Sequence, residues 1–417
     1  MDFEALESTA RRSALQLAAR ILEAALNADE SDHSGAFLPC RCGAPARYGG
    51  RRPKTVLSAV GQMTIERAYY YCEHCGSGFC PRDEQLNIGR GGLSTAVVRM
   101  VGLTAALVSF EETAELLNCL AGVAISSKLC ERTAEAVGRD ILEDERLWVR
   151  EHRPRSQTMY LGTDGTGVPM RPEELKGRSG KQPDGSAKTR EVKLVAIWSA
   201  DGRDGEGRAV RDAGSVSYNA AIESAATADT DEDLSAFALR VGREATRRGF
   251  DEASRRVVIG DGAKWIWKMS EELFPGATEI VDLYHAKGTL SDTAKAIFGP
   301  DSEEGKAWAK SRRDELEEGK LKEILEALQA HLSNEKAVNC RKYLLTNQKR
   351  MRYPAFRAAG LCVSSGVLEA GCKCTVGTRL KRAGMHWTLH GANEIIGLRC
   401  CKLSGRCDDY WERRKAG

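Results

Sequence analysis

The chain has 417 residues, 42% of them hydrophobic, with 62 basic and 59 acidic side chains and a formal net charge of +3. A chain of this length exceeds one simple core, so we expect two to four domains. The near-neutral charge does not mark the whole chain as a nucleic-acid binder, so any basic surface must be local. No apolar run approaches the roughly 20 residues of a membrane span. Because the N-terminus also lacks the order of a secretory signal, we predict a cytoplasmic protein with no membrane partner, whose cysteines are reduced or metal-bound.

Residues 1–30 carry the pattern of one amphipathic helix. Apolar residues recur at helical spacing between residues 2 and 28, and Arg11, Arg12 and Arg20 occupy the other side. This pattern predicts a helix that packs on another element or forms a dimer.

Residues 31–90 change character, because glycine, proline and cysteine punctuate short β-like runs. Two close cysteine pairs flank a predicted hairpin: Cys40 and Cys42, then Cys72 and Cys75. Four thiolates placed in this way can surround a Zn²⁺ ion tetrahedrally. Such a small module buries little apolar surface, so a structural zinc ion would stabilise a zinc-ribbon-like fold.

Two further residues keep the zinc ligand set open, because Cys80 or His74 can replace one of the four cysteines. Basic residues lie between the cysteine pairs, among several tyrosines: Arg51, Arg52 and Lys54. They predict phosphate contacts beside aromatic stacking faces, as in a DNA-binding module. The alternative is a zinc site with a purely structural role.

Residues 91–150 return to helical spacing. Two predicted helices are separated by a turn around Gly122, and serines precede the second helix. This spacing is typical of a helix-turn-helix region, in which Lys128 and Arg132 would face DNA. Packing between two ordinary helices is the alternative.

Residues 151–299 predict an ordered series of strands and helices. Three strands come first and then helices alternate with strands, which favours a mixed α/β sheet over a doubly wound one. We expect strands at 158–164, 191–199, 214–219, 256–260 and 278–283, and helices at 232–248, 263–273 and 285–297.

Residues 300–360 are polar, rich in Glu and Lys, and carry leucines at helical spacing, so they predict a helical insertion. Residues 361–417 then return to the core, with helices expected at 366–374 and 391–403.

Three carboxylates lie where elements of this core meet. Asp164 and Asp261 each follow an apolar β-run and precede a glycine, and Glu369 lies in a helix after the insertion. A charge in such a place is costly unless a cation lies opposite. If the first and fourth strands are neighbours, the three side chains meet at one sheet edge and can hold two divalent metal ions ~3.5–4 Å apart. The alternative is that the aspartates are turn residues and Glu369 is a first-turn helix acid.

Four stretches carry a resemblance to a known family: 160–169, 260–267, 281–287 and 366–387. Together they resemble the DDE transposases of bacterial insertion sequences, within the Mutator-like superfamily and more narrowly its ISKra-type family. The resemblance covers nearly the whole chain. It implies an RNase H-like mixed-sheet core with an α-helical insertion, preceded by a small zinc ribbon and a helix-turn-helix region.

By this resemblance, Asp164, Asp261 and Glu369 bind two Mg²⁺ or Mn²⁺ ions. Asp282 and His285 match the Asp-x-x-His signature of Mutator-like transposases, and an imidazole at a helix start can act on a phosphate or a leaving group. A structural histidine is the alternative. Basic residues after Glu369 are predicted to guide a DNA end: Lys373, Arg379, Lys381 and Arg382.

The resemblance implies metal-dependent cleavage and strand transfer at the ends of an insertion sequence. The partners would be double-stranded DNA, as terminal inverted repeats and target, and further copies of the chain in at least a dimer. The protein would lie on the bacterial nucleoid when bound to DNA. Two other hypotheses stay open: a domesticated, catalytically silent DNA-binding regulator, and an RNase H-like metal nuclease.

Overall fold

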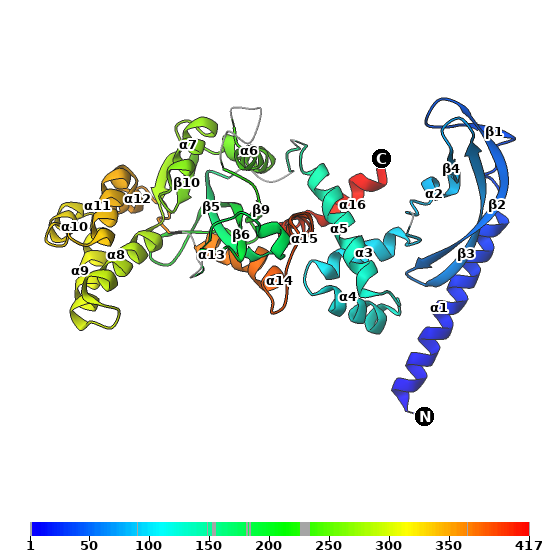
Figure 1. Ribbon diagram of the computed structural model, residues 1–417, viewed down its shortest axis with the longest axis horizontal. Helices are drawn as coiled ribbons and strands as arrows, with labels where there is room; N and C mark the ends of the chain where they lie inside the picture. Colours follow the sequence, from blue (N-terminus) through cyan, green and yellow to red (C-terminus); the bar gives the residue numbers. More distant parts are fainter. Residues whose placement is uncertain are drawn as a thin grey trace. The chain divides into compact units, whose positions relative to one another are not determined.

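The structure is a computed structural model of the chain, which divides into two compact units, Met1–Val137 and Gly138–Gly417 (Figure 1). It describes residues 2–89, 91–147, 149–151, 156–180, 182, 185–225, 234–364 and 366–416.

The first unit is built on a four-stranded antiparallel sheet in the order β1-β2-β3-β4. Its long central hairpin turns at Gly61, whose φ of +134° suits a residue without Cβ. The strands are β1 (Phe37–Pro39), β2 (Pro45–Ser58), β3 (Gly61–Cys72) and β4 (Ser77–Phe79).

Helix α1 (Phe3–Ala28) covers the part of β3 that β4 does not reach. The backbone N–H of Thr64 donates to the Glu23 carboxylate at 2.6 Å, and the N–H of Glu66 donates to the Asn27 side chain at 2.8 Å. These side chains take the place of a missing neighbouring strand, so the sheet edge is not left open. The predicted N-terminal helix is therefore present, and one of its faces packs on the sheet.

The rest of the first unit is helical. A capping box between Ser109 and Glu112 starts α4, and Gly122, with φ +69°, separates its end from α5. The helices are α2 (Pro81–Gln85), α3 (Thr95–Ala105), α4 (Phe110–Leu116), the π-helical η1 (Leu117–Ala121) and α5 (Ser127–Asp144), whose residues from Gly138 on belong to the second unit. Two helices joined by a turn thus lie where the sequence predicts them.

The second unit contains a mixed five-stranded sheet in the order β11-β10-β5-β6-β9. The first three strands along the chain form an antiparallel meander, and β10 and β11 run parallel to β5. This confirms the predicted mixed α/β sheet. The strands are β5 (Thr158–Pro169), β6 (Thr189–Ser199), β9 (Ser217–Ala221), β10 (Arg255–Gly260) and β11 (Thr278–Val281).

Several strand boundaries differ from prediction by one to five residues, most clearly those of β5 and β9. The first strand does not end at Asp164, because β6 continues the antiparallel pairing through Pro169 opposite Thr189. The weak third strand begins at Ser217 rather than 214, where pairing with β6 begins. The first residues of the predicted helix 232–248 lie outside the described residues, and α6 accounts for the rest from Ala236.

Helices surround this sheet. They are α6 (Ala236–Arg248), α7 (Lys264–Leu273), α8 (Leu283–Phe298), α13 (Gly366–Cys372), α14 (Thr378–Leu380), α15 (Leu389–Leu403) and α16 (Cys407–Ala416), with the π-helical η6 (Lys373–Gly377) between α13 and α14. The α6 end and the segment around Arg406 share a buried ionic cluster. Within it, Arg406 binds Glu244 at 2.9 Å and Glu145 at 2.6 Å, and Arg247 binds Glu244 at 2.8 Å.

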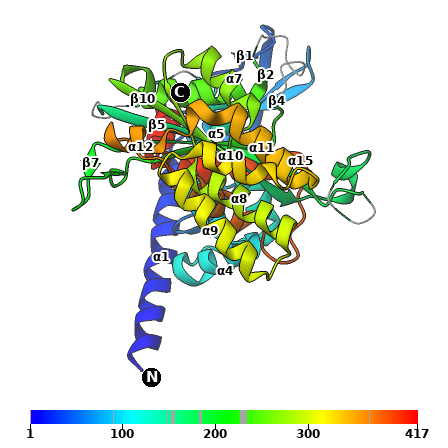
Figure 2. The ribbon, with the colours of Figure 1, turned by 90° about the vertical axis from the view of Figure 1, so that its left-hand side faces the viewer.

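The segment between α8 and α13 is helical, as the sequence predicts. Its interior is formed by the buried side chains of Leu316, Ile324, Leu328 and Leu344. The helices are α9 (Glu303–Glu317), α10 (Leu321–Gln329), α11 (Glu335–Asn347) and α12 (Tyr353–Ala358). Figure 2 shows α9, α10 and α11 beside α8.

Candidate functional site

A cavity of about 530 Å³ opens beside β5 and β10, two neighbouring inner strands of the five-stranded sheet. Strands β5 and β10 and helices α8 and α13 all contribute to its lining. Five side chains singled out by the sequence line it together: Asp164, Asp261, Asp282, His285 and Glu369. Residues from distant parts of the chain therefore meet at one place.

The parallel register of β5 and β10 explains why the two aspartates meet. Gly162 pairs with Ile259, so Asp164 and Asp261 each lie two residues beyond a matched pair. Both side chains are half-buried. One oxygen of Asp261 accepts a 2.8 Å hydrogen bond from the N–H of Ala263, which leaves its other oxygen available to a ligand.

Glu369 reaches the cavity because α13 lies close against the sheet. A Cβ on Gly162 would lie 2.9 Å from the Leu368 methyl groups, and a Cβ on Gly371 would lie 2.9 Å from the Tyr218 ring. Only hydrogen fits at these two positions, one on the strand and one on the helix. This close approach leaves the Glu369 side chain exposed at the cavity.

Cys372 also belongs to α13, and its Sγ lies 3.5 Å from Oδ2 of Asp164. The thiol is buried, and this burial together with the Asp164 charge raises the pKa of Cys372. A buried thiol with a raised pKa behaves as a small apolar residue.

The Asp282–His285 pair lies at the start of α8. Asp282 caps this helix, because its carboxylate accepts a 3.0 Å hydrogen bond from the N–H of His285. The His285 ring is exposed and lines the cavity. The capping role therefore belongs to the aspartate, and the imidazole remains accessible.

The helical insertion contacts the turn that carries Asp261. The Tyr343 hydroxyl donates to the Asp261 carbonyl at 2.9 Å, and Asn347 accepts from the Trp267 indole N–H at 3.0 Å. Gly262 follows with φ +101°, and a Cβ there would lie 2.5 Å from the Tyr343 ring. Sequence reasoning missed Tyr343 and Asn347, because nothing in the pattern of a polar helix indicates which residues face another segment.

Carboxylates are suitable ligands for Mg²⁺ or Mn²⁺. Among the described residues, however, only a cysteine cluster brings three or more candidate ligand atoms within 4.8 Å of one another. The carboxylate oxygens of Asp164, Asp261 and Glu369 therefore do not all lie within 4.8 Å of one another. Hard cations of this kind keep several water ligands, which can occupy such space.

The cysteine cluster consists of Cys40, Cys42, Cys72 and Cys75. Two Sγ–Sγ distances within it, Cys40 to Cys75 and Cys42 to Cys72, are both 3.6 Å. A tetrahedral zinc ion with Zn–S bonds of 2.3 Å requires Sγ–Sγ distances of about 3.8 Å. The four cysteines therefore fit Zn²⁺ and could bind it.

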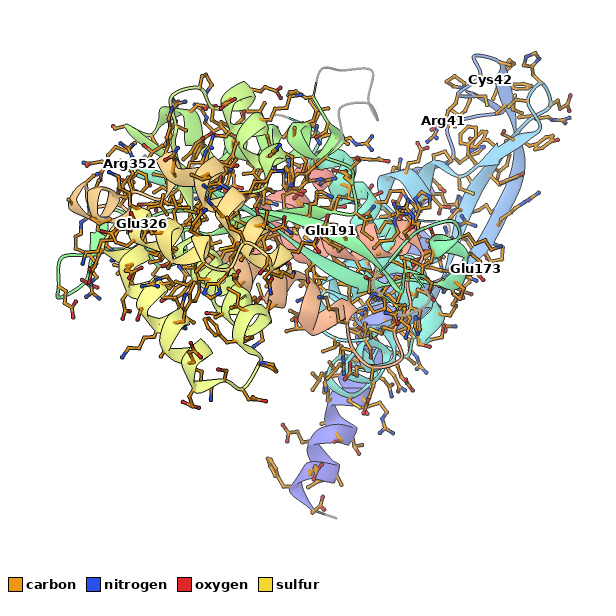
Figure 3. The ribbon with its side chains drawn as sticks, turned by 60° about the vertical axis from the view of Figure 1, so that its left-hand side comes forward. Arg41, Cys42, Glu173, Glu191, Glu326 and Arg352 are labelled. Carbon is orange, nitrogen blue, oxygen red and sulfur yellow. The ribbon has the colours of Figure 1, made fainter. Side chains whose placement is uncertain are left out.

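Two similar turns present these thiols. After Cys40 and after Cys72, the N–H of a glycine donates back to the cysteine carbonyl at 2.9 Å, and both glycines, Gly43 and Gly76, have positive φ. Hydrogen bonds from Ser77 lower the pKa of Cys75 to about 6, which favours the thiolate that a metal needs. Figure 3 labels Cys42 in this part of the first unit.

The two other candidate zinc ligands do not belong to this cluster. Cys80 is buried as the first residue before α2, and burial raises the pKa of its thiol. His74 is exposed beside the cluster. The structure thus groups the four cysteines of the two close pairs.

Comparison with known protein families identifies the family to which the chain belongs. A family model described as "Uncharacterised protein family (UPF0236)" matches residues 1–409. The chain belongs to the UPF0236 family. No curated protein matches it.

Among solved structures, the UPF0236 chain is similar to one described as "Drosophila P element transposase strand transfer complex". The identity is 10% and the TM-score 0.28, over 81% of this chain and 84% of the other. A TM-score of this size does not establish a common fold. Of the helices that the structure describes in the UPF0236 chain, none has both the length and the apolar character that crossing a membrane requires.

The basic residues predicted to bind DNA in the first unit of the UPF0236 chain have internal partners. Arg51 pairs with Asp32 at 3.2 Å and Lys54 pairs with Asp83 at 3.0 Å, and their side chains are only 21% and 14% exposed. Arg52 stacks on the Tyr69 ring, with its guanidinium 3.5 Å from the ring centroid. These contacts stabilise the hairpin, so a phosphate would have to compete with them.

The remaining predicted basic residues differ in exposure. Lys128 and Arg132 are exposed on α5, and Lys128 pairs with Glu131. Lys373, Lys381 and Arg382 are exposed after Glu369, whereas Arg379 is fully buried beside the Trp387 ring. A buried guanidinium cannot reach a DNA backbone in this arrangement.

Proposed function

We propose that this UPF0236 protein is a DDE-type transposase that cleaves DNA at the ends of an insertion sequence and transfers the strand to target DNA. We assign it to the Mutator-like superfamily and to the ISKra-type family. The observation that carries the proposal is the meeting of Asp164, Asp261 and Glu369 at one cavity, from β5, the turn after β10, and α13.

The surrounding fold supports this proposal. The proposed RNase H-like core consists of the antiparallel meander, the two parallel strands β10 and β11, and α13 beside β5. The helical insertion enters after β11 and α8 and leaves just before the helix of Glu369. It thus separates the second and third carboxylates along the chain, while the cavity brings them together.

The chemistry follows from the donor set. Asp164, Asp261 and Glu369 would hold two Mg²⁺ or Mn²⁺ ions, which supply an activated water or 3′-hydroxyl and stabilise the leaving oxygen. His285 lies at the same cavity, where its imidazole can transfer a proton to or from an oxygen of the phosphodiester. Such a site works by positioning and electrostatics and needs no covalent protein–DNA bond.

DNA recognition would involve both units. Lys128 and Arg132 are exposed on α5, and a zinc-bound cysteine module would hold the first unit's hairpin in shape. Near the cavity, Lys373, Lys381 and Arg382 would contact the phosphates of the element's terminal repeats or of target DNA. We leave Arg51, Arg52, Lys54 and Arg379 out of this interface because of their internal contacts. Two DNA ends must be processed together, so at least a dimer would act on the nucleoid DNA of the bacterial cytoplasm.

The test is a cleavage assay with the purified protein and DNA that carries the sequences flanking its own coding region. Cleavage at the element boundary in Mg²⁺ or Mn²⁺ is expected, and EDTA or Asp261→Asn should abolish it while DNA binding persists. Asp251→Asn is the matched control, because this aspartate is 52% exposed and pairs with Arg256 outside the cavity.

Three outcomes are informative. Boundary cleavage lost only in Asp261→Asn supports the transposase. Specific binding without cleavage in any metal contradicts it and supports a catalytically silent regulator. Cleavage without preference for the boundary and without strand transfer supports an RNase H-like nuclease.

A further inference from the structure

One face of helix α1 packs within the first unit. Ala19 is buried there, and a Cβ on Gly61 would lie 3.4 Å from the Ala19 methyl group. Leu26 packs against the buried core of the hairpin, and Asn27 bonds to the edge of β3. These contacts fix which side of the helix faces the sheet.

The opposite side of α1 carries an apolar stripe that the described residues of the first unit leave uncovered. Its large members are Phe3, Leu6, Leu17 and Ile21, which are 80%, 51%, 60% and 61% exposed. They lie in one row, because their spacings of 3, 11 and 4 residues correspond to about one, three and one helical turns. A folded surface rarely exposes such a contiguous row unless a partner covers it. In Figure 1 the N-terminal half of this helix extends beyond the turn between β2 and β3.

We propose that this α1 stripe pairs antiparallel with the α1 stripe of a second copy of the chain. In that orientation Phe3 faces Ile21 of the partner subunit, and Leu6 faces Leu17 of the partner subunit. The small residues Ala10 and Ala14 meet near the centre, where they let the two helices approach closely. The interface is isologous, as expected for a twofold dimer.

The charges beside the stripe favour this orientation. Asp2 and Arg20 are 18 residues apart, so about five turns place them on the same flank. The antiparallel pair brings Asp2 opposite Arg20 of the partner subunit, and the twofold axis repeats this contact. A parallel pair would instead bring Asp2 towards Glu7 of the partner subunit on the other flank, where like charges repel.

This inference depends only on the first unit and does not rest on the proposed DNA cleavage. The α1 stripe spans about 27 Å at 1.5 Å per residue. It includes four large apolar side chains per copy, and burying all eight on pairing removes a substantial apolar area from water.

The test measures the mass of the full-length protein by sedimentation over a range of micromolar concentrations. The wild type should be dimeric, and the double variant Leu6→Glu/Leu17→Glu should be monomeric throughout. The matched control, Ser8→Glu/Gln16→Glu, adds the same charge at exposed positions of α1 outside the stripe and should stay dimeric. Circular dichroism should show equal helix content in all three proteins. A monomeric wild type, or a dimer that survives Leu6→Glu/Leu17→Glu, would overturn the proposal.

A second experiment tests the orientation. Arg20→Glu should raise the dimer dissociation constant roughly threefold to tenfold, because it places two acidic groups together on each flank. Adding Asp2→Lys to that variant removes the cap that Asp2 forms with the Ala5 N–H, yet should lower the dissociation constant below that of Arg20→Glu alone. If Arg20→Glu leaves the dissociation constant unchanged, the antiparallel arrangement is wrong.

Discussion

Asp261 is held from two sides. Its carboxylate accepts a hydrogen bond from the N–H of Ala263, and its carbonyl accepts one from the Tyr343 hydroxyl at 2.9 Å. Tyr343 belongs to α11 of the insertion, so a helix distant in sequence fixes the turn that carries a proposed metal ligand. Because only hydrogen fits at Gly262 against the Tyr343 ring, this contact is also sterically defined.

Tyr343→Phe should therefore affect the site more than the fold. Losing one hydrogen bond is expected to cost about 1 kcal/mol of stability. If the bond positions Asp261, the variant should need a higher Mg²⁺ concentration for half-maximal cleavage, by roughly twofold to tenfold. Tyr353→Phe is the matched control, because its buried hydroxyl donates a 3.1 Å bond to the Val281 carbonyl. Equal metal requirements in the two variants would show that Tyr343 has no positioning role.

At the scale of elements, the close contact between α13 and the sheet depends on Gly162 on β5 and Gly371 on α13. Gly371 faces Tyr218 and Leu194, and a Cβ there would lie 2.9 Å and 3.1 Å from their side chains. Gly366 begins the same helix, and a Cβ there would meet nothing within 4 Å.

Gly371→Ala and Gly366→Ala should consequently change stability in opposite directions. The added methyl at Gly371 must displace core side chains, with an expected loss of about 1–3 kcal/mol in the free energy of unfolding. At Gly366 the alanine lowers the entropy of the unfolded chain, with an expected gain of about 0.4–1 kcal/mol. Denaturant unfolding of both variants measures these changes. A neutral Gly371→Ala would mean that α13 can move away from the sheet.

Much of this architecture is predictable from local sequence. Apolar β-runs such as Val257 to Ile259 stay recognisable wherever they pack, and the change from meander to alternation indicates a mixed sheet. The end of β5 is not predictable, because it depends on how far β6 continues to pair. The contacts of Tyr343 and Gly371 cannot be predicted from local sequence either, because both depend on residues far away in the chain. The exposed or buried state of Arg379 likewise follows only from tertiary packing.

At the scale of the whole second unit, a buried ionic cluster joins Glu145, just after α5, to α6 and to the segment after α15. Glu244 is fully buried and forms ion pairs with Arg406 and Arg247. Burial alone would raise the pKa of Glu244, but the two guanidinium groups outweigh it and lower the pKa to about 2. Removing one partner from a buried ion pair leaves the other charge uncompensated, which is strongly destabilising.

The cluster therefore predicts a specific acid sensitivity. A carboxylate whose pKa is lower in the folded state stabilises the fold above its unfolded value of 4.5, and this contribution is lost as the pH falls towards 2. Glu244→Gln should cost about 3 kcal/mol at pH 7 and should make unfolding less dependent on pH between 4.5 and 2. Glu303 has a side chain that is 86% exposed, so Glu303→Gln should change neither the stability at pH 7 nor the pH dependence of unfolding. Thermal unfolding of the two variants and the wild type at neutral and acidic pH measures both effects. Equal pH dependence in Glu244→Gln and wild type would show that Glu244 is not ionised inside the fold.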